Sequence, residues 1–70
     1  MTNREWLNSL SDEDMALAIV NQNIRILHDY RYKKFLEENH NENVGKEFVL
    51  KYKAIQTLLL EEWLKANKEA

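Results

Sequence analysis

Apolar residues recur every three or four positions along two long stretches of this chain, which is the spacing of an amphipathic helix. We predict one helix over residues 12–38 and another over residues 44–68. The main apolar stripe of the first helix is formed by Val20, Ile24, Leu27 and Phe35. The main apolar stripe of the second is formed by Phe48, Tyr52, Ile55, Leu59 and Trp63. Each stripe gives its helix one face to bury.

The two stripes match each other as the arms of an antiparallel hairpin. Folding the chain between the helices pairs Phe35 with Phe48, Leu27 with Ile55, Ile24 with Leu59, and Val20 with Trp63. The residue numbers of each pair add to nearly the same value, as an antiparallel register requires. Arg31 falls opposite Tyr52, where its aliphatic stem can pack while the guanidinium group stays in water. We therefore expect packing of the kind found in helical bundles.

The opening stretch MTNREWLNSLSDEDMA holds two helix-start signals. Thr2 is followed three residues later by Glu5, and Ser11 by Asp14, which is the spacing of a capping box. The first box predicts a short helix over residues 3–10, and the second predicts the start of the long helix.

We expect the short helix to fold back over the open end of the hairpin as a lid. It carries Trp6, Leu7 and Leu10 on one side. These side chains would meet apolar residues near the end of the chain, namely Leu60, Trp63 and Leu64. The lid would cover part of the apolar surface that the seam leaves open.

An asparagine-rich segment separates the two long helices. Residues 39–43 read NHNEN and Gly45 follows shortly after, a composition typical of a loop. The chain has no proline and only this one glycine, so little else in it interrupts a helix. Residues 1–70 therefore predict a single all-α domain, with a short N-terminal helix followed by a long antiparallel helical hairpin.

The chain has more large apolar side chains than one hairpin seam can bury. A candidate interface remains once the lid is placed, formed by Ile26, Tyr30, Val49, Leu50 and Leu58. Contiguous exposed apolar groups usually mark a binding surface, and a chain of 70 residues has only a small core of its own. We expect a homodimer that completes a helical bundle. A self-sufficient three-helix monomer is the alternative, and the patch could equally serve another protein.

Composition narrows the cellular setting. Cysteine is absent, which excludes disulfides and thiolate metal sites and fits a reducing compartment. No apolar run is long enough for a membrane span, and the first residues lack the apolar stretch of a signal peptide. We therefore expect a cytoplasmic protein.

Two residue pairs are candidates for chemistry, and neither has the partners that it needs. His28 and Asp29 are neighbours, and consecutive helix residues point about 100° apart, so they do not face each other as a proton-transfer pair. Glu37 and His40 have the spacing of di-iron carboxylate sites, but this motif occurs once and those sites need two. We predict no catalytic residue, no metal and no cofactor.

Basic residues alternate with tyrosine in the segments RYKKF and KYK. Arg31, Lys34, Lys51 and Tyr52 could lie together near the loop and contact nucleic acid. The net charge of the chain is −2, and several glutamates in the same region weaken the positive field. A small nucleic-acid-binding helical hairpin is therefore the alternative function, and binding that falls steeply with salt would identify it.

Both ends of the chain resemble a known group of proteins. The start MTNREWLNSLSDED and the end LLLEEWLKANKEA are similar to the ends of small, mostly uncharacterised proteins from phages and prophages of low-GC Gram-positive bacteria. Many of those proteins look like small zinc-binding domains with a cysteine cluster, which this chain lacks, so no metal role is carried over. The resemblance implies a phage or mobile-element origin and, with it, the host cytoplasm.

The resemblance also implies a mode of action, because small phage proteins of this kind often bind a host protein, sometimes a defence nuclease. The leading hypothesis is a non-enzymatic protein-interaction protein, for example an inhibitor of a host defence system such as an anti-CRISPR protein. A purely structural homodimer, whose partner is itself, is a third hypothesis.

Overall fold

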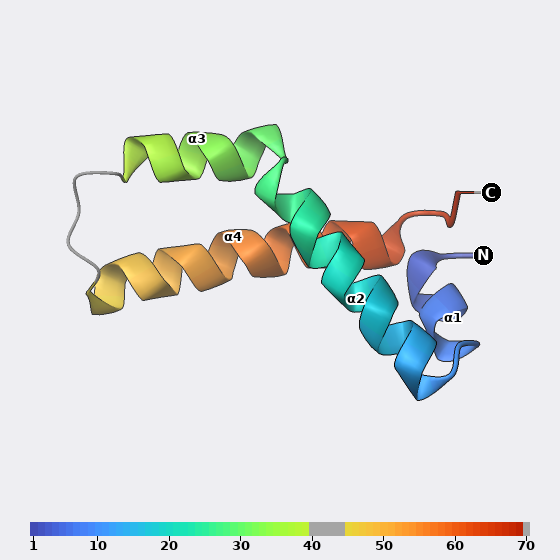
Figure 1. Ribbon diagram of the computed structural model, residues 1–70. Coiled ribbons are helices and arrows are strands. Elements are labelled where there is room, and N and C mark those ends of the chain that lie inside the picture. Colours follow the sequence, from blue (N-terminus) through green and yellow to red (C-terminus); the bar gives the residue numbers. More distant parts are fainter. Residues whose placement is uncertain (40–44, 70) are drawn as a thin grey trace.

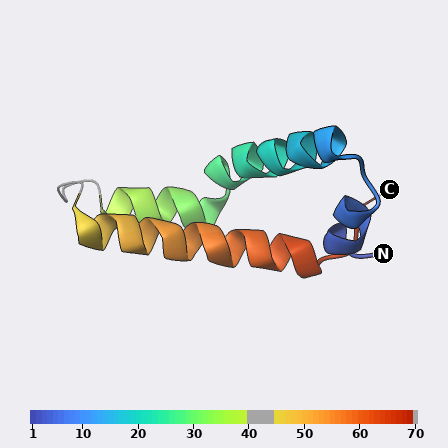
Figure 2. The same cartoon turned by 90° about the horizontal axis from the view of Figure 1, so that it is seen from below.

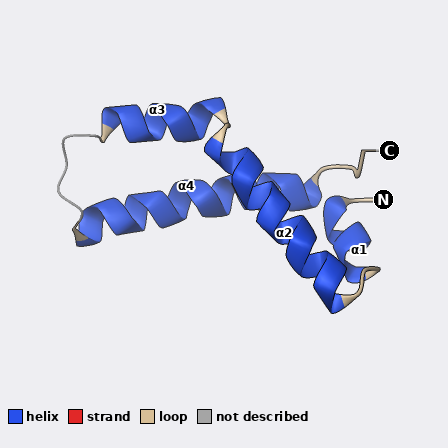
Figure 3. Ribbon diagram, viewed as in Figure 1, coloured by secondary structure: helices blue, strands red, loops and turns tan. Residues whose placement is uncertain are grey.

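The computed structural model describes residues 1–39 and 45–69, which form four helices (Figure 3). They are α1 (Asn3–Asn8), α2 (Asp12–Leu27), α3 (Tyr30–Glu38) and α4 (Lys46–Lys65). No strand occurs in the described ranges, although an isolated β-bridge joins Thr2 and Asn67. The expected all-α fold is confirmed.

Helix α4 runs along the length of the molecule, and the other helices are arranged along it (Figure 1). α3 lies antiparallel to its first half, and α2 crosses its second half at an oblique angle. α1 lies at the far end, between the start of α2 and the end of α4, as Figure 2 shows. Both termini lie at this end of an elongated molecule that measures 41 × 21 × 15 Å.

The first two helices start at the residues that the sequence indicates. Thr2 caps α1 in a full capping box: its hydroxyl accepts from the Glu5 N–H at 3.2 Å, and the Glu5 carboxylate accepts from the Thr2 N–H at 2.9 Å. The Ser11 hydroxyl accepts from the Asp14 N–H at 3.2 Å and so caps α2. Side-chain oxygens therefore satisfy backbone donors that each new helix leaves unpaired.

The other helix boundaries differ from the prediction by a few residues. α1 ends at Asn8 instead of residue 10, and α4 ends at Lys65 instead of residue 68. Asn39 follows α3, and its side-chain amide donates to the Phe35 carbonyl at 2.7 Å. The rest of the predicted loop and the predicted helix start at residue 44 lie outside the described residues.

The predicted continuous helix over residues 12–38 is wrong, because the chain breaks between α2 and α3. His28 is the C-cap that follows α2, and Asp29 takes an extended conformation and caps α3. The Asp29 carboxylate accepts a hydrogen bond from the Arg31 N–H at 2.8 Å. Aspartate is among the best N-cap residues, since its side chain offers the backbone an alternative to the continuing helix. The helix therefore breaks here without glycine or proline.

The break changes which side of α2 is buried. Ile26 is only 2% exposed and forms the core with Tyr32 and Leu59. The residues expected in the seam are about half exposed, namely Val20, Ile24 and Leu27. The predicted pairs between α2 and α4 are therefore wrong, because a different face of α2 is turned toward Leu59.

α3 packs on α4 in the expected register through an aromatic cluster. The Phe35 and Phe48 rings lie 5.7 Å apart between centroids, which confirms that pair. Tyr32, rather than Arg31, lies opposite Tyr52, with ring centroids 6.0 Å apart. Burial and a hydrogen bond with Tyr52 raise the pKa of Tyr32 to about 12. The buried Tyr32 phenol therefore stays neutral at physiological pH.

α1 closes the open end of the fold through hydrogen bonds to the end of α4. The Asn3 side-chain amide donates to the Trp63 carbonyl at 2.7 Å, and the Asn3 N–H donates to the Ala66 carbonyl at 2.9 Å. Asn3 is only 5% exposed. Leu7 is buried and lines a hollow together with Leu64. A lid thus forms at the expected place, held in part by buried polar contacts.

Replacing Asp29 by alanine is expected to lower the free energy of unfolding by about 1 kcal/mol, because α3 loses its cap. Lys33→Ala is the control, since Lys33 is exposed on the same helix, and it should change the free energy by less than about 0.5 kcal/mol. Urea unfolding followed by circular dichroism measures both variants.

The pH dependence of stability gives a second readout of the same variant. Hydrogen bonds from Arg31 lower the pKa of Asp29. The stabilisation from Asp29 is therefore present above the ordinary aspartate pKa and is lost as pH falls through the lower value of the folded state. Asp29→Ala should lose less stability in acid than the wild type. An identical acid profile in both proteins would contradict the role of Asp29 as a cap.

Candidate protein interface

Helix α2 carries a row of apolar side chains on its solvent side, which we call the outer stripe. It consists of Leu17, Val20, Ile24 and Leu27, which are 59%, 52%, 51% and 47% exposed, respectively. Scattered apolar side chains are normal on a protein surface, but a row of four on one helix face is not. The outer stripe is therefore the candidate binding surface.

Helical geometry explains why this row faces outward. Ile26 is held in the core, and each residue of a helix turns the chain by about 100°. Ile24 therefore points about 160° away from Ile26. Ala18 and Gln22 precede Ile26 at intervals of four residues, share its face and are half-buried. Burying this inner face of α2 leaves the outer stripe nearly opposite, in solvent.

The spacing of the outer stripe is that of a coiled-coil seam. Its members are three, four and three residues apart, the pattern in which two helices pack side chains of one between those of the other. Asn21 and Asn23 lie along its two edges, and both are exposed. The stripe thus has the apolar centre and polar rim of a helix–helix interface.

The predicted interface residues do not form one patch. Ile26 belongs to the core, so its assignment to an interface is wrong. Tyr30 is 73% exposed and belongs to α3, whereas the outer stripe belongs to α2, before the break. Val49 and Leu50 line a hollow at the start of α4, whereas Leu58 lines a different hollow between α3 and α4. These four residues are on the surface, as expected, but they are divided among separate places.

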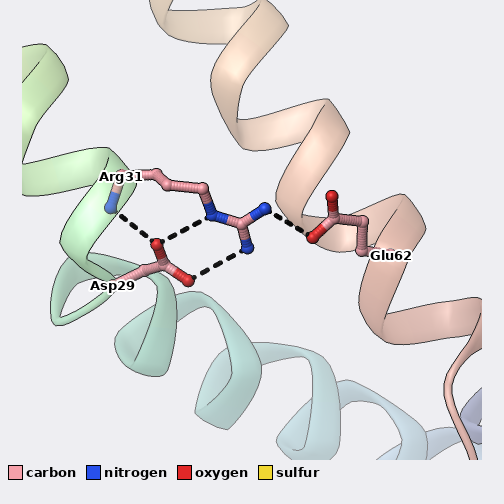
Figure 4. Close-up of polar contacts among 3 residues, drawn as sticks. All are labelled: Asp29, Arg31 and Glu62. Carbon is pink, nitrogen blue, oxygen red and sulfur yellow. Dashed lines mark hydrogen bonds and ion pairs between the residues drawn. The ribbon is translucent and has the colours of Figure 1, made fainter.

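Arg31, a predicted nucleic-acid contact, is held between two carboxylates (Figure 4). Its guanidinium group lies 3.3 Å from Asp29 and 2.7 Å from Glu62 of α4. Hydrogen bonds with both carboxylates raise the pKa of Arg31, and the hydrogen bonds that Arg31 donates to Asp29 lower the pKa of Asp29. The positive charge of Arg31 is thus balanced within the fold, where it links the start of α3 to α4.

Tyr52, another predicted nucleic-acid contact, belongs to the aromatic cluster. Its ring is half-buried and packs against rings of both α3 and α4. Its hydroxyl accepts a hydrogen bond from the Gln56 amide at 2.9 Å. Lys34 and Lys51 remain exposed on α3 and α4. Two of the four predicted contacts are thus engaged within the fold: Arg31 is paired with carboxylates, and Tyr52 is packed among other rings.

The candidate proton-transfer and metal-binding residues either have structural roles or lie outside the described residues. His28 is the C-cap that follows α2, while Asp29 points to Arg31, so the two do not act as a pair. The predicted motif of Glu37 and His40 ends outside the described residues. Within the described part of the chain, no three His, Asp or Glu side chains gather as a metal site. None of the described helices combines the length and apolar character that crossing a membrane requires.

Sequence reasoning missed the outer stripe as a surface, because Val20, Ile24 and Leu27 also fit the spacing of the hairpin seam. The signal that could have revealed it is Asp29. Aspartate is favoured at the start of a helix and disfavoured inside one. Because the helix breaks at Asp29, the buried face of α2 need not be aligned with the buried face of α3.

Comparison with known proteins adds no relative. The sequence matches no protein-family model, no curated protein and no solved structure.

Proposed function

We propose that this protein acts by binding another protein and has no catalytic role. The observation that supports the proposal is the outer stripe of α2. The free energy falls when large aliphatic side chains leave water, so a row of them on the surface favours contact with a second apolar surface. The row runs from Leu17 to Leu27, which is a length of about 15 Å on a helix.

The surface is suited to an apolar helix. The outer stripe is one side chain wide, has the spacing of a helical seam and has asparagines along both edges. A helix with apolar residues at the same alternating spacing would interlock with it. The proposed mode of binding is therefore helix on helix.

We further propose that this binding serves a phage or another mobile element in the cytoplasm of a bacterial host. The support is the resemblance of both chain ends to those of small phage proteins. The target is then a host protein, and a component of a defence system, as for an anti-CRISPR protein, is the leading class.

Nucleic-acid binding is not proposed as a second function. Arg31 is paired with Asp29 and Glu62, and Tyr52 is packed among other rings. No comparable observation among the described residues favours a nucleic-acid surface over the outer stripe.

Capture from a bacterial extract tests the proposal. Immobilised wild-type protein is expected to retain a host protein, and Ile24→Glu should retain it at least about tenfold less, because a charge in the centre of the stripe opposes contact. Leu50→Glu is the matched control, since Leu50 is 66% exposed on α4 and lies outside the stripe. It should capture as the wild type does. Equal retention by all three proteins, measured by mass spectrometry, would contradict the proposal.

A further inference from the structure

We infer that the partner of the outer stripe is a second copy of this chain, with the two α2 helices antiparallel across a two-fold axis. This inference rests on the proposed function, because it assigns an occupant to the same surface. A host protein that binds the outer stripe then displaces the second copy.

The outer stripe is complementary to itself in the antiparallel direction. A two-fold axis midway between Val20 and Ile24 places Val20 against Ile24 of the partner subunit. It also places Leu17 against Leu27 of the partner subunit. Alternating three- and four-residue steps keep these contacts in line along both helices. Each copy therefore supplies the apolar helix that the stripe of the other copy requires.

The asparagines along the edges fit the same axis. In this arrangement Asn21 comes close to Asn21 of the partner subunit, and Asn23 comes close to Asn23 of the partner subunit. A side-chain amide both donates and accepts hydrogen bonds, so two identical amides can pair. A charged residue at either position would instead be repelled by its own copy. The residues next to the axis are thus compatible with self-association.

Charge decides the direction of the pairing. α2 begins with three consecutive acids, Asp12, Glu13 and Asp14. Glu13 lies four residues before Leu17, in line with the stripe, so parallel pairing would press it against Glu13 of the partner subunit. Antiparallel pairing instead places the acids of the two copies at opposite ends of the interface, about 27 Å apart along the helix axis. Like charges repel, so the parallel pair is disfavoured and the antiparallel dimer is favoured.

The small core supplies a reason for the dimer to form. Among the described hydrophobic residues, Leu7, Ile26, Tyr32 and Leu59 are buried. Small domains expose a large fraction of their surface and commonly gain stability by association. Pairing through α2 adds four half-exposed aliphatic side chains from each copy to the buried surface. The dimer thus enlarges the apolar interior without changing the fold of either chain.

Light scattering after size exclusion tests the dimer. The wild type is expected at twice the chain mass, and both Ile24→Glu and Leu17→Glu are expected at the single chain mass with helical circular dichroism retained. Leu50→Glu should remain dimeric, since it lies outside the stripe. A wild type that has the single chain mass at high protein concentration would overturn the inference, as would a dimer that neither stripe variant dissociates.

Cysteine cross-linking tests the direction, because the chain has no native cysteine. Leu17→Cys mixed with Leu27→Cys should form a disulfide between the two variants on mild oxidation. Leu17→Cys alone should link no faster than the surface control Leu50→Cys. Rapid linking of Leu17→Cys to itself would show a parallel dimer and overturn the antiparallel arrangement.

The two proposals fail in different ways. A monomeric wild type whose capture of a host protein is lost in Ile24→Glu would remove the self-association and leave protein binding in place. A monomeric wild type whose capture is unaffected by Ile24→Glu would remove both. A wild-type dimer that Ile24→Glu dissociates, with capture of the host protein lost in the same variant, would support both, because the same stripe then serves both contacts.

Discussion

Replacing Ile26 by alanine is expected to lower the free energy of unfolding by about 2–5 kcal/mol, the usual effect of removing a buried isoleucine side chain. Ile26 is 2% exposed and packs in the core with Tyr32 and Leu59. Domains of this length are stable by roughly 4–10 kcal/mol in total. Ile26→Ala should therefore lose a large share of the stability of the domain and unfold at a clearly lower urea concentration and temperature than the wild type, as urea titration and thermal circular dichroism will measure.

Leu50→Ala is the control for this experiment. Leu50 is 66% exposed, so its truncation should change the free energy of unfolding by less than about 0.5 kcal/mol. If Ile26→Ala were as mild as Leu50→Ala, Ile26 would be on the surface, as a continuous helix over residues 12–38 requires. The comparison thus distinguishes a broken helix from an unbroken one.

Replacing Asn3 by alanine is expected to lower the free energy of unfolding by about 1–3 kcal/mol, because a buried polar contact is lost and its partner is left less well satisfied. The Asn3 amide donates to the Trp63 carbonyl in the last turn of α4, where backbone acceptors have few helical donors. The Asn3 N–H also holds the Ala66 carbonyl. Loosening this contact should shift the tryptophan fluorescence before the helical signal is lost.

Asn8→Ala is the matched control, since Asn8 is an exposed asparagine at the other end of α1. It should leave both the fluorescence and the unfolding midpoint near those of the wild type. Equal effects at Asn3 and Asn8 would mean that the contact between α1 and α4 does not depend on the buried amide.

The parts of the fold that sequence analysis predicted correctly are those with local or strongly paired signals. Thr2 and Ser11 mark helix starts because their hydroxyls bond to backbone N–H groups three residues away. The pair of Phe35 and Phe48 follows from a register that starts at the turn of the hairpin. Both kinds of signal act over short distances, so distant packing does not alter them.

The candidate site was not predicted, because it depends on an orientation and not on a pattern. α2 has apolar residues on two faces, and either face can be written as a helical stripe. A continuous helix would force the buried faces of α2 and α3 to line up. The break at Asp29 lifts this constraint, and Ile26 then packs on Leu59. The outer stripe is what remains after that choice.

Helix content, the starts of α1 and α2, and the absence of disulfides follow from the sequence alone, because they depend on neighbouring residues and on composition. Three features appear only in the tertiary structure: the inward face of α2, the buried amide of Asn3, and the pairing of Arg31 with Glu62. The physical reason is the same in each case. These contacts join residues far apart in the chain, and their formation depends on how well whole helices fit together.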